Sequence, residues 1–296
     1  MNWSSDYSRC LGLASAVERH GVGLHSGAPC RVRLQPGAEP GFRLGWLDSP
    51  QQAPQLLEPS QVADTRLCTA LKFGDRQVAT VEHLLAALAG TGLTQVEILV
   101  EGEEVPLLDG SALPWVEAIA EAGLQDLGPR GPLMPLPEPI TLQQGLSFVA
   151  ALPSDRLMIT AAIEFPQAAI GRQLFSIELS PANFVEEIAP ARTFGFRDQV
   201  EQLQAAGLIR GGALDNALVC DGAQWLNPPL RFSDEPVRHK LLDLIGDLAL
   251  VGLPQAQVLA FRGSHALHTS LAAALDRRPL SLSERPGRQD KSPAAR

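Results

Sequence analysis

Two stretches of the chain place apolar residues at helical spacing and follow them with an apolar run that contains β-branched residues. In the first stretch, residues 83–90 carry the helical pattern and residues 96–100 carry the β-branched run. In the second, residues 239–246 carry the helical pattern and residues 257–261 follow. Apolar positions three and four apart predict an amphipathic helix, and β-branched runs predict strands. Each half of the chain is therefore predicted to contain a helix that leads into a strand, which suggests an internal duplication.

The same patterns predict further elements in both halves. Strands are expected at residues 30–34, 146–151, 157–165 and 174–179, and helices at residues 113–122 and 197–206. Strands followed by helices within each half are typical of α+β architecture. We therefore expect two α+β domains that pack together.

A proline-rich segment at residues 129–139 divides the chain into halves of similar size. Its five prolines exclude a helix and favour extended backbone, because proline fixes one backbone angle and lacks an N–H donor. We expect an N-terminal domain at residues 1–128, a linker at residues 129–139 and a C-terminal domain at residues 140–280. Residues 281–296 are polar and without periodicity, which predicts a disordered tail.

Charge and cysteine content exclude several classes of protein. The chain has 33 acidic and 24 basic residues and a net charge of −9, which argues against nucleic acid as a partner. Its four cysteines are scattered without a C-x-x-C pair, as expected of reduced thiols in a cytoplasmic protein. No apolar run approaches the roughly 18 residues of a membrane-spanning helix, so no stable membrane insertion is expected. The sequence has no heptad repeats and no long apolar helix that would be exposed, so we expect a monomer by default.

One candidate site lies on the predicted helix around His239. His239, Asp243 and Asp247 are four residues apart, so they share one face of that helix. A histidine and a carboxylate at this spacing can bind one zinc ion, which accepts nitrogen and oxygen ligands at about 2.0 to 2.2 Å. A solvated charged face is the alternative interpretation of the same pattern.

A second candidate lies at the start of the predicted helix around residue 83. Thr80 is a candidate helix cap that would place Glu82 and His83 in the first turn. A glutamate beside a histidine can supply a general base next to a metal ligand. The alternative is structural, because the helix macrodipole favours a glutamate in the first turn without any catalytic role.

A third candidate follows the predicted strand at residues 257–261. His265 lies after a glycine-containing turn, and a histidine there can act as a general acid because it titrates near neutral pH. A loop histidine without a role is the alternative. The segments at residues 109–111 and 210–212 have the composition of turns, and neither has the spacing of a phosphate-binding glycine motif.

Five segments of the chain are considered together: residues 80–90, 106–112, 191–196, 211–216 and 231–243. In their order and spacing, these segments resemble the zinc-dependent UDP-3-O-acyl-N-acetylglucosamine deacetylase family of lipid A biosynthesis. The resemblance extends from about Gly21 to Leu271, which is nearly the whole chain. It implies an α+β fold of two similar domains, each a β-sheet layer with helices, packed as a β-α-α-β sandwich. The active site would lie at the domain junction.

The resemblance also implies a cofactor and a set of catalytic roles. Zinc (Zn²⁺) would be bound by His83, His239 and Asp243, which together leave a coordination position open. Glu82 would be the general base that takes a proton from the attacking water. The hydroxyl of Thr193, together with the metal, would stabilise the developing oxyanion.

Three more residues would complete the catalytic set. His265 would protonate the leaving amine, and Asp247 would hold the imidazole ring by a hydrogen bond. Lys240 would contribute positive charge nearby. Because the chain contains only three lysines, a lysine at this position mildly supports that assignment.

The implied substrate, UDP-3-O-acyl-N-acetylglucosamine, requires contacts for a nucleotide, a sugar and an acyl chain. Glu164 and Phe165 match an acidic-Phe pair at the uridine, and Arg262 would contact the diphosphate. The apolar positions in the segment from residue 194 to residue 208 match a hydrophobic passage for the acyl chain. These positions are Phe194, Val200, Leu203 and Leu208.

The chain departs from the family pattern near the expected general acid. Family members often have Ser-Gly-His where this chain has Gly263-Ser264-His265, and His268 stands where asparagine is common. Two other functions remain open: a catalytically silent homologue that binds a nucleotide sugar, and a zinc deacetylase of another acetylated sugar. The presence of Glu82, Thr193 and His265 favours an active enzyme.

Overall fold

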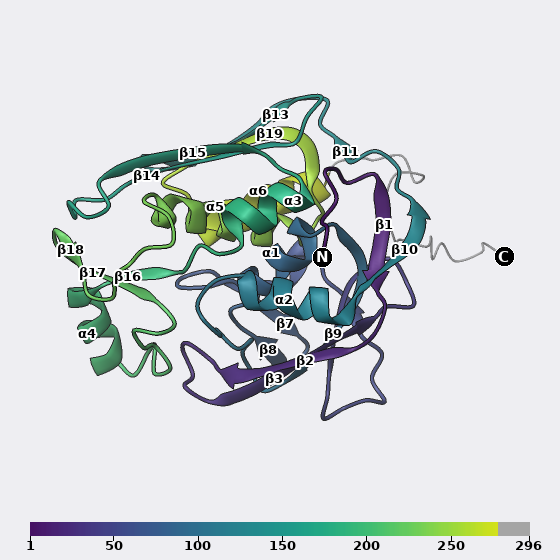
Figure 1. Cartoon of the computed structure of the whole chain (residues 1–296), viewed down its shortest axis with the longest axis horizontal. Coiled ribbons are helices and arrows are strands. Elements are labelled where there is room, and N and C mark those ends of the chain that lie inside the picture. Colours follow the sequence, from purple (N-terminus) through teal and green to yellow (C-terminus); the bar gives the residue numbers. More distant parts are fainter. Residues whose placement is uncertain (278–296) are drawn as a thin grey trace.

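The computed structural model describes residues 1–277 of the chain (Figure 1). The predicted tail at residues 281–296 lies outside the described residues, as do residues 278–280 of the predicted C-terminal domain. The described part contains two large sheets and two small ones, with helices between the large sheets.

The first large sheet is built around β9 (Leu93–Glu101), the strand expected from the β-branched run at residues 96–100. Val96, Ile98 and Val100 are buried while the residues between them are more exposed, so one face of β9 packs on the core. The other strands are β1 (Arg9–Leu13), β2 (Val17–Val22), β3 (Pro29–Pro36), β4 (Gly41–Trp46), β5 (Gln55–Leu56) and β10 (Leu124–Pro129).

The second large sheet is built around β19 (Pro254–Phe261) in the same way. Its other strands are β11 (Met134–Pro135), β12 (Ile140–Gln144), β13 (Ser147–Pro153), β14 (Met158–Glu164) and β15 (Arg172–Glu178). The expected proline-rich segment contains no helix, and part of it pairs with β19 as β11.

The two large sheets share a topology. β9 pairs antiparallel with β3 and parallel with β4, whereas β19 pairs antiparallel with β13 and parallel with β14. In each half a buried helix directly precedes the central strand: α1 (Glu82–Gly90) precedes β9, and α5 (Glu235–Leu248) precedes β19. The repeated arrangement confirms the prediction of two similar α+β units.

Four helices form the middle of the sandwich. α1 packs against α5, while α2 (Leu113–Ala122) and α6 (His265–Asp276) flank this pair. Figure 1 shows β13, β14, β15 and β19 on one side of these helices and β2, β3 and β9 on the other. The β-α-α-β order of layers is therefore confirmed. None of the described helices is long and apolar enough to cross a membrane.

The remaining elements are short. One small sheet contains β6 (Val62–Asp64), β7 (Ala70–Phe73) and β8 (Arg76–Val78), and the other contains β16 (Phe194–Phe196), β17 (Leu218–Asp221) and β18 (Gln224–Trp225). The last helical segments are η1 (Pro59–Gln61), α3 (Pro181–Asn183), η2 (Phe184–Ile188) and α4 (Arg197–Ala205). The helices expected at residues 113–122 and 197–206 correspond to α2 and α4.

One local prediction and one alternative interpretation are wrong. Thr80 does not cap α1, because Val81 occupies the cap position; Thr80 instead donates a hydrogen bond to Glu104 and has a positive φ of 58°. His265 does not lie in a loop, because it is the first residue of α6. Ser264 caps that helix by accepting a hydrogen bond from the backbone N–H of Leu267.

The contact between α1 and α5 depends on Gly246. A Cβ atom at this position would lie 2.1 Å from the backbone carbonyl oxygen of Glu82, so only glycine permits the observed approach of the two helices.

We expect Gly246→Ala to lower the free energy of unfolding by about 1–3 kcal/mol, because overpacking at a backbone contact forces the helices apart. Urea unfolding of the purified variant would measure this change. Gly131→Ala is the matched control, because a Cβ atom at residue 131 would have no neighbouring atom within 4 Å. Equal unfolding midpoints for the two variants would contradict the proposed close approach.

Candidate active site

The candidate residues of α1 and α5 come together where the two helices pack. Glu82 and His83 begin α1, and His239, Asp243 and Asp247 follow one face of α5. All five side chains are buried, with 0–5% of each residue exposed. A solvated charged face is therefore the wrong interpretation of the α5 pattern, because that face is covered by α1.

His83, His239 and Asp243 bring three potential metal ligands to one point. The Nε2 atoms of His83 and His239 lie 3.7 and 3.3 Å from Oδ1 of Asp243, and the ligand atoms all lie within 4.8 Å of one another. Oδ1 of Asp243 is buried without a hydrogen-bond partner among residues 1–277. A buried carboxylate oxygen of this kind fits a metal ligand, since buried polar atoms otherwise find partners.

The chemistry of His239 also suits a metal ligand. Its Nδ1–H donates to the carbonyl oxygen of Ala191 at 3.0 Å, which leaves the lone pair of Nε2 facing Asp243. Burial lowers the pKa of His239 to about 3, so the imidazole is neutral near physiological pH. A neutral imidazole with a fixed tautomer is the form that binds a cation.

Lys240 compensates the charge of Asp243. Its ammonium donates to Oδ2 of Asp243 at 2.8 Å, while Oδ1 remains directed at the two histidines. Burial would raise the pKa of Asp243, but the charges of Lys240 and His239 outweigh it and hold that pKa well below its usual range. Asp243 is thus an anion with one oxygen occupied by the chain and one oxygen open to a metal.

Glu82 lies next to the three potential metal ligands. Its Oε2 accepts the backbone N–H of Thr69 at 3.0 Å, and its Oε1 lies 3.9 Å from Nε2 of His265. Burial raises the pKa of Glu82 above its ordinary value. This carboxylate therefore has the increased proton affinity that a general base requires.

His265 faces Glu82 from the start of α6 and is held by Asp247. Its Nδ1–H donates to Oδ2 of Asp247 at 2.9 Å, which leaves Nε2 facing Glu82. Burial alone would lower the pKa of His265, but the Asp247 carboxylate outweighs burial and raises it to about 9. The hydroxyl of Thr69 donates to the other oxygen of Asp247 at 2.5 Å.

Thr193 and Phe194 border the site from the start of β16. The backbone N–H of Thr193 donates to Gly110, and its carbonyl accepts from Leu218, both at 2.8 Å. The ring of Phe194 lies edge-on to His239 with centroids 6.4 Å apart. These two hydrogen bonds hold the backbone of Thr193 in place. Thr193 is also only two residues from Ala191, whose carbonyl oxygen binds His239.

Glu235 organises this wall of the site, although nothing in the sequence pattern singled it out. Its buried carboxylate accepts from the backbone and Nε of Arg192 and from the backbone N–H of Arg231. Arg231 in turn pairs with Asp109 at 2.8 Å. Because Asp109 and Gly110 belong to the turn that holds Thr193, that turn has a structural role beyond reversing the chain.

The residues expected to contact the nucleotide lie at the ends of β14 and β19. Glu164 accepts hydrogen bonds from Arg172 at 2.6 Å and from Arg262 at 2.5 Å, so the Arg262 side chain is already ion-paired. The ring of Phe165 contacts that of Phe194, with centroids 5.6 Å apart. Phe194 therefore links the group around Phe165 to His239.

The residues expected to bind the acyl chain lie on and after α4. Val200 and Leu203 are half-buried on this helix, which has no fully buried residue. Leu208 follows the helix and is 41% exposed. α4 packs against β16 and β17, so it stands beside the wall that carries Thr193 and Phe194.

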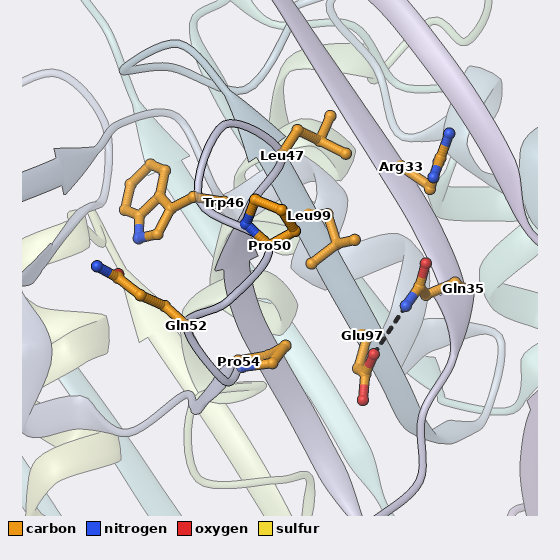
Figure 2. Close-up of a pocket in the computed structure, with 9 residues that line it drawn as sticks. All are labelled: Arg33, Gln35, Trp46, Leu47, Pro50, Gln52, Pro54, Glu97 and Leu99. Carbon is orange, nitrogen blue, oxygen red and sulfur yellow. Dashed lines mark hydrogen bonds between the residues drawn. The ribbon is translucent and has the colours of Figure 1, made fainter.

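Two cavities lie away from these residues. A cavity of about 290 Å³ lies on the first large sheet. Figure 2 shows the residues that line it, which belong to β3, β4 and β9 and to the segment after β4. Its β9 residues, Glu97 and Leu99, alternate with the core positions Val96, Ile98 and Val100, which places the cavity on the outer face. A second cavity, of about 470 Å³, includes Arg130 and Asn183 in its lining. Neither is lined by a candidate catalytic residue.

Sequence reasoning missed two polar residues within the site, Thr69 and Glu235. It also missed the contact of His268 with Asp247. Thr69 precedes a short strand and carries no motif, and its side chain reaches Asp247 across 178 positions of sequence. Only the three-dimensional packing could identify it.

Comparisons with known proteins identify the family of the chain. A profile of the UDP-3-O-acyl N-acetylglycosamine deacetylase (LpxC) family matches residues 11–277. A UDP-3-O-acyl-N-acetylglucosamine deacetylase of Thermosynechococcus vestitus is 49% identical over 265 residues, covering 89% of this chain and 92% of that protein. A protein of the same name from Trichormus variabilis is 49% identical over 267 residues, covering 88% and 95%.

A more distant relative comes from a plant. An Arabidopsis thaliana protein named probable UDP-3-O-acyl-N-acetylglucosamine deacetylase 1, mitochondrial, is 41% identical over 285 residues, covering 89% of this chain and 86% of that protein. The family profile spans both large sheets and the helices between them. On these grounds the chain belongs to the UDP-3-O-acyl N-acetylglycosamine deacetylase family.

Proposed function

We propose that this protein is a zinc-dependent hydrolase that removes the N-acetyl group of UDP-3-O-acyl-N-acetylglucosamine. The products would be UDP-3-O-acyl-glucosamine and acetate, and the reaction would be the committed step of lipid A biosynthesis. The observation that carries the proposal is the meeting of His83, His239 and Asp243 beside Glu82 and His265 in one buried site. The names of the relatives support the same substrate.

The three ligand residues would hold the metal through Nε2 of His83, Nε2 of His239 and Oδ1 of Asp243. This set of two nitrogens and one oxygen suits Zn²⁺ and leaves a position for a reacting oxygen. When bound there, zinc would polarise the acetamide carbonyl and lower the pKa of water. Lys240 would keep Asp243 ionised by its contact with Oδ2.

Glu82 would act as the general base. Its raised pKa equips it to take a proton from water as that water attacks the acetamide carbonyl carbon. The Thr69 N–H would keep the carboxylate oriented through Oε2, so that Oε1 remains available for the proton. Thr193 would donate its hydroxyl to the oxyanion that forms on the carbonyl oxygen.

His265 would act as the general acid. Its Nε2–H would pass a proton to the amine nitrogen as the C–N bond breaks, so that the sugar leaves as a neutral amine. Asp247 holds Nδ1 and favours the protonated ring, which supports this role. The acid and the base stand 3.9 Å apart, so both could reach the same reacting amide.

The remaining predicted residues would bind the parts of the substrate that do not react. Phe165 would stack on the uridine, with Glu164 beside it, and Arg262 would contact the diphosphate. Phe194, together with Val200, Leu203 and Leu208 of the α4 region, would line the passage for the acyl chain. Each buried methylene would contribute about 0.8 kcal/mol to binding, so chain length can be discriminated here.

That the protein acts in the cytoplasm and as a monomer stays a prediction from the sequence.

Acetate release from UDP-3-O-acyl-N-acetylglucosamine by the purified protein tests the proposal directly. We expect release to stop after treatment with a chelator and to return when one equivalent of Zn²⁺ is added. Release that is insensitive to chelation would contradict metal dependence. No release from zinc-loaded protein with several acyl lengths would favour the silent homologue or a deacetylase of another sugar.

We expect Glu82→Gln to retain one bound zinc but to reduce kcat by about 10²–10⁴-fold, because the variant lacks a general base. His239→Ala should lose both the zinc and the activity. Metal content by mass spectrometry and acetate release on the same samples would separate the two effects. Glu117→Gln, at an exposed position of α2, is the control. A Glu82→Gln variant with near-normal kcat would remove Glu82 from the mechanism.

We expect Asp247→Asn to lower the pKa of His265 from about 9, because it removes the negative charge that favours the imidazolium. Because folding raises the pKa of His265 from 6.5 to about 9, protonation of His265 stabilises the fold. This contribution is fully present below pH 6.5 and is lost as the pH rises through about 9. NMR titration of His265 in chelator-treated protein would measure the shift. Asp155→Asn, whose side chain is 93% exposed, is the control. An unchanged titration midpoint would show that Asp247 does not tune His265.

A further inference from the structure

We propose that His268 is a positioning residue for the reaction: it fixes the carboxylate of Asp247 so that His265 presents Nε2 to the substrate. This inference rests on the proposed function of His265 as the general acid. It concerns a side chain that touches neither the three metal-ligand atoms nor Glu82 in the contacts described above. Three features of the structure support it: the geometry of Asp247, the unpaired nitrogen of His268 and the space at Gly263 for its ring.

Asp247 is held by three donors, of which two lie on α6 and one precedes β7. Its Oδ2 accepts from Nδ1 of His265 at 2.9 Å and from Nδ1 of His268 at 3.1 Å. Its Oδ1 accepts from the hydroxyl of Thr69 at 2.5 Å. Asp247 and His268 are 0% and 1% exposed. With both oxygens engaged, the carboxylate cannot rotate without breaking a buried hydrogen bond.

The same contacts fix the tautomer of His268. Nε2 of His268 is buried and has no hydrogen-bond partner among residues 1–277, whereas Nδ1 faces a carboxylate oxygen. A proton on Nε2 would leave a buried donor unpaired and place a bare nitrogen against an anion. The proton therefore lies on Nδ1, and His268 is a fixed donor to Asp247.

This donor has a consequence for His265. Both imidazoles use their Nδ1–H groups on one oxygen of Asp247, so the proton that His265 can transfer is the one on Nε2. Nε2 is the nitrogen that lies 3.9 Å from Glu82. Without His268, Oδ2 would be held by His265 alone, and only the Thr69 hydroxyl on Oδ1 would keep the carboxylate and the His265 ring from turning together away from the substrate.

The chain keeps space for the His268 ring at Gly263. A Cβ atom at residue 263 would lie 2.4 Å from Nε2 of His268 and 3.1 Å from the side chain of Ala260. The ring cannot retreat without giving up its bond to Asp247. Glycine at residue 263 and histidine at residue 268 therefore form one steric unit, which accounts for two neighbouring departures from the family pattern.

The first experiment compares His268→Ala, His268→Asn and wild-type protein, each loaded with zinc. We expect His268→Ala to lower kcat by about 10-fold with KM unchanged, as is typical when the partner of a catalytic group is lost. Asparagine carries an N–H group where histidine carries Nδ1, so His268→Asn should restore most of kcat. His20→Asn, at an exposed histidine, is the control. Wild-type kcat in His268→Ala, or no recovery in His268→Asn, would overturn the proposal.

The second experiment tests the steric unit by a double-mutant cycle. Gly263→Ala alone should lower kcat about as much as His268→Ala, because the new methyl group displaces the ring. In the His268→Asn background the shorter side chain frees this space, so Gly263→Ala should have much less effect. Gly131→Ala, which introduces a methyl group into open space, is the control. Equal effects of Gly263→Ala in both backgrounds would contradict the coupling.

Nitrogen NMR of histidine-labelled, chelator-treated protein separates this proposal from the proposed function. It reports the tautomer of His268 without any turnover, and we expect the proton on Nδ1 together with a hydrogen bond to Asp247. A proton on Nε2 would overturn the positioning role even if the protein releases acetate. The Nδ1–H tautomer in a protein that releases no acetate would instead refute the proposed function and leave the geometry of Asp247 intact.

Discussion

The burial of ionisable side chains between two sheets is the constraint on which the rest of this structure depends. Glu82, Asp243 and Asp247 lie where α1 and α5 pack, and a carboxylate removed from water is costly unless charges or donors compensate it. Lys240 compensates Asp243, and His265 compensates Asp247. Much of the polar chemistry around the site can be understood as the set of partners that these carboxylates require. A bound cation would complete that set at Oδ1 of Asp243.

The repeated topology of the two halves explains where the site lies, but it does not explain which site residues come from each half. Each half contributes a helix that precedes its central strand, and packing of the two halves brings these helices together. Gly246 permits the close approach, so that the first turn of α1 faces the middle of α5. In the proposed mechanism α1 would supply one ligand and the base, whereas α5 would supply two ligands and the partner of the acid. Two similar scaffolds thus support an unequal division of chemistry.

Sequence periodicity predicted the elements that depend on local pattern, but not the features that depend on packing between distant segments. The spacing of His239, Asp243 and Asp247 predicted a shared helical face, yet its burial depends on α1, which is far away in the sequence. The glycine before Ser264 suggested a flexible turn, but the pattern did not indicate that Ser264 caps α6 directly after it. Thr80 resembled a cap, but Glu104 binds its hydroxyl. Thr69 and Glu235 have no motif, because their roles arise only from contacts across the fold.

The two aspartates of α5 are four residues apart on one helical face, and the difference between them follows from their neighbours. Asp243 has one oxygen bound to Lys240 and one without a hydrogen-bond partner among residues 1–277, so it can still accept a cation. Asp247 has both oxygens occupied by Thr69, His265 and His268, so its remaining function is to orient the groups that donate to it. The number of donors around each carboxylate therefore distinguishes a potential metal ligand from a carboxylate that can only position its donors on the same helix. This separation could not be deduced from the spacing alone, since the donors come from outside α5.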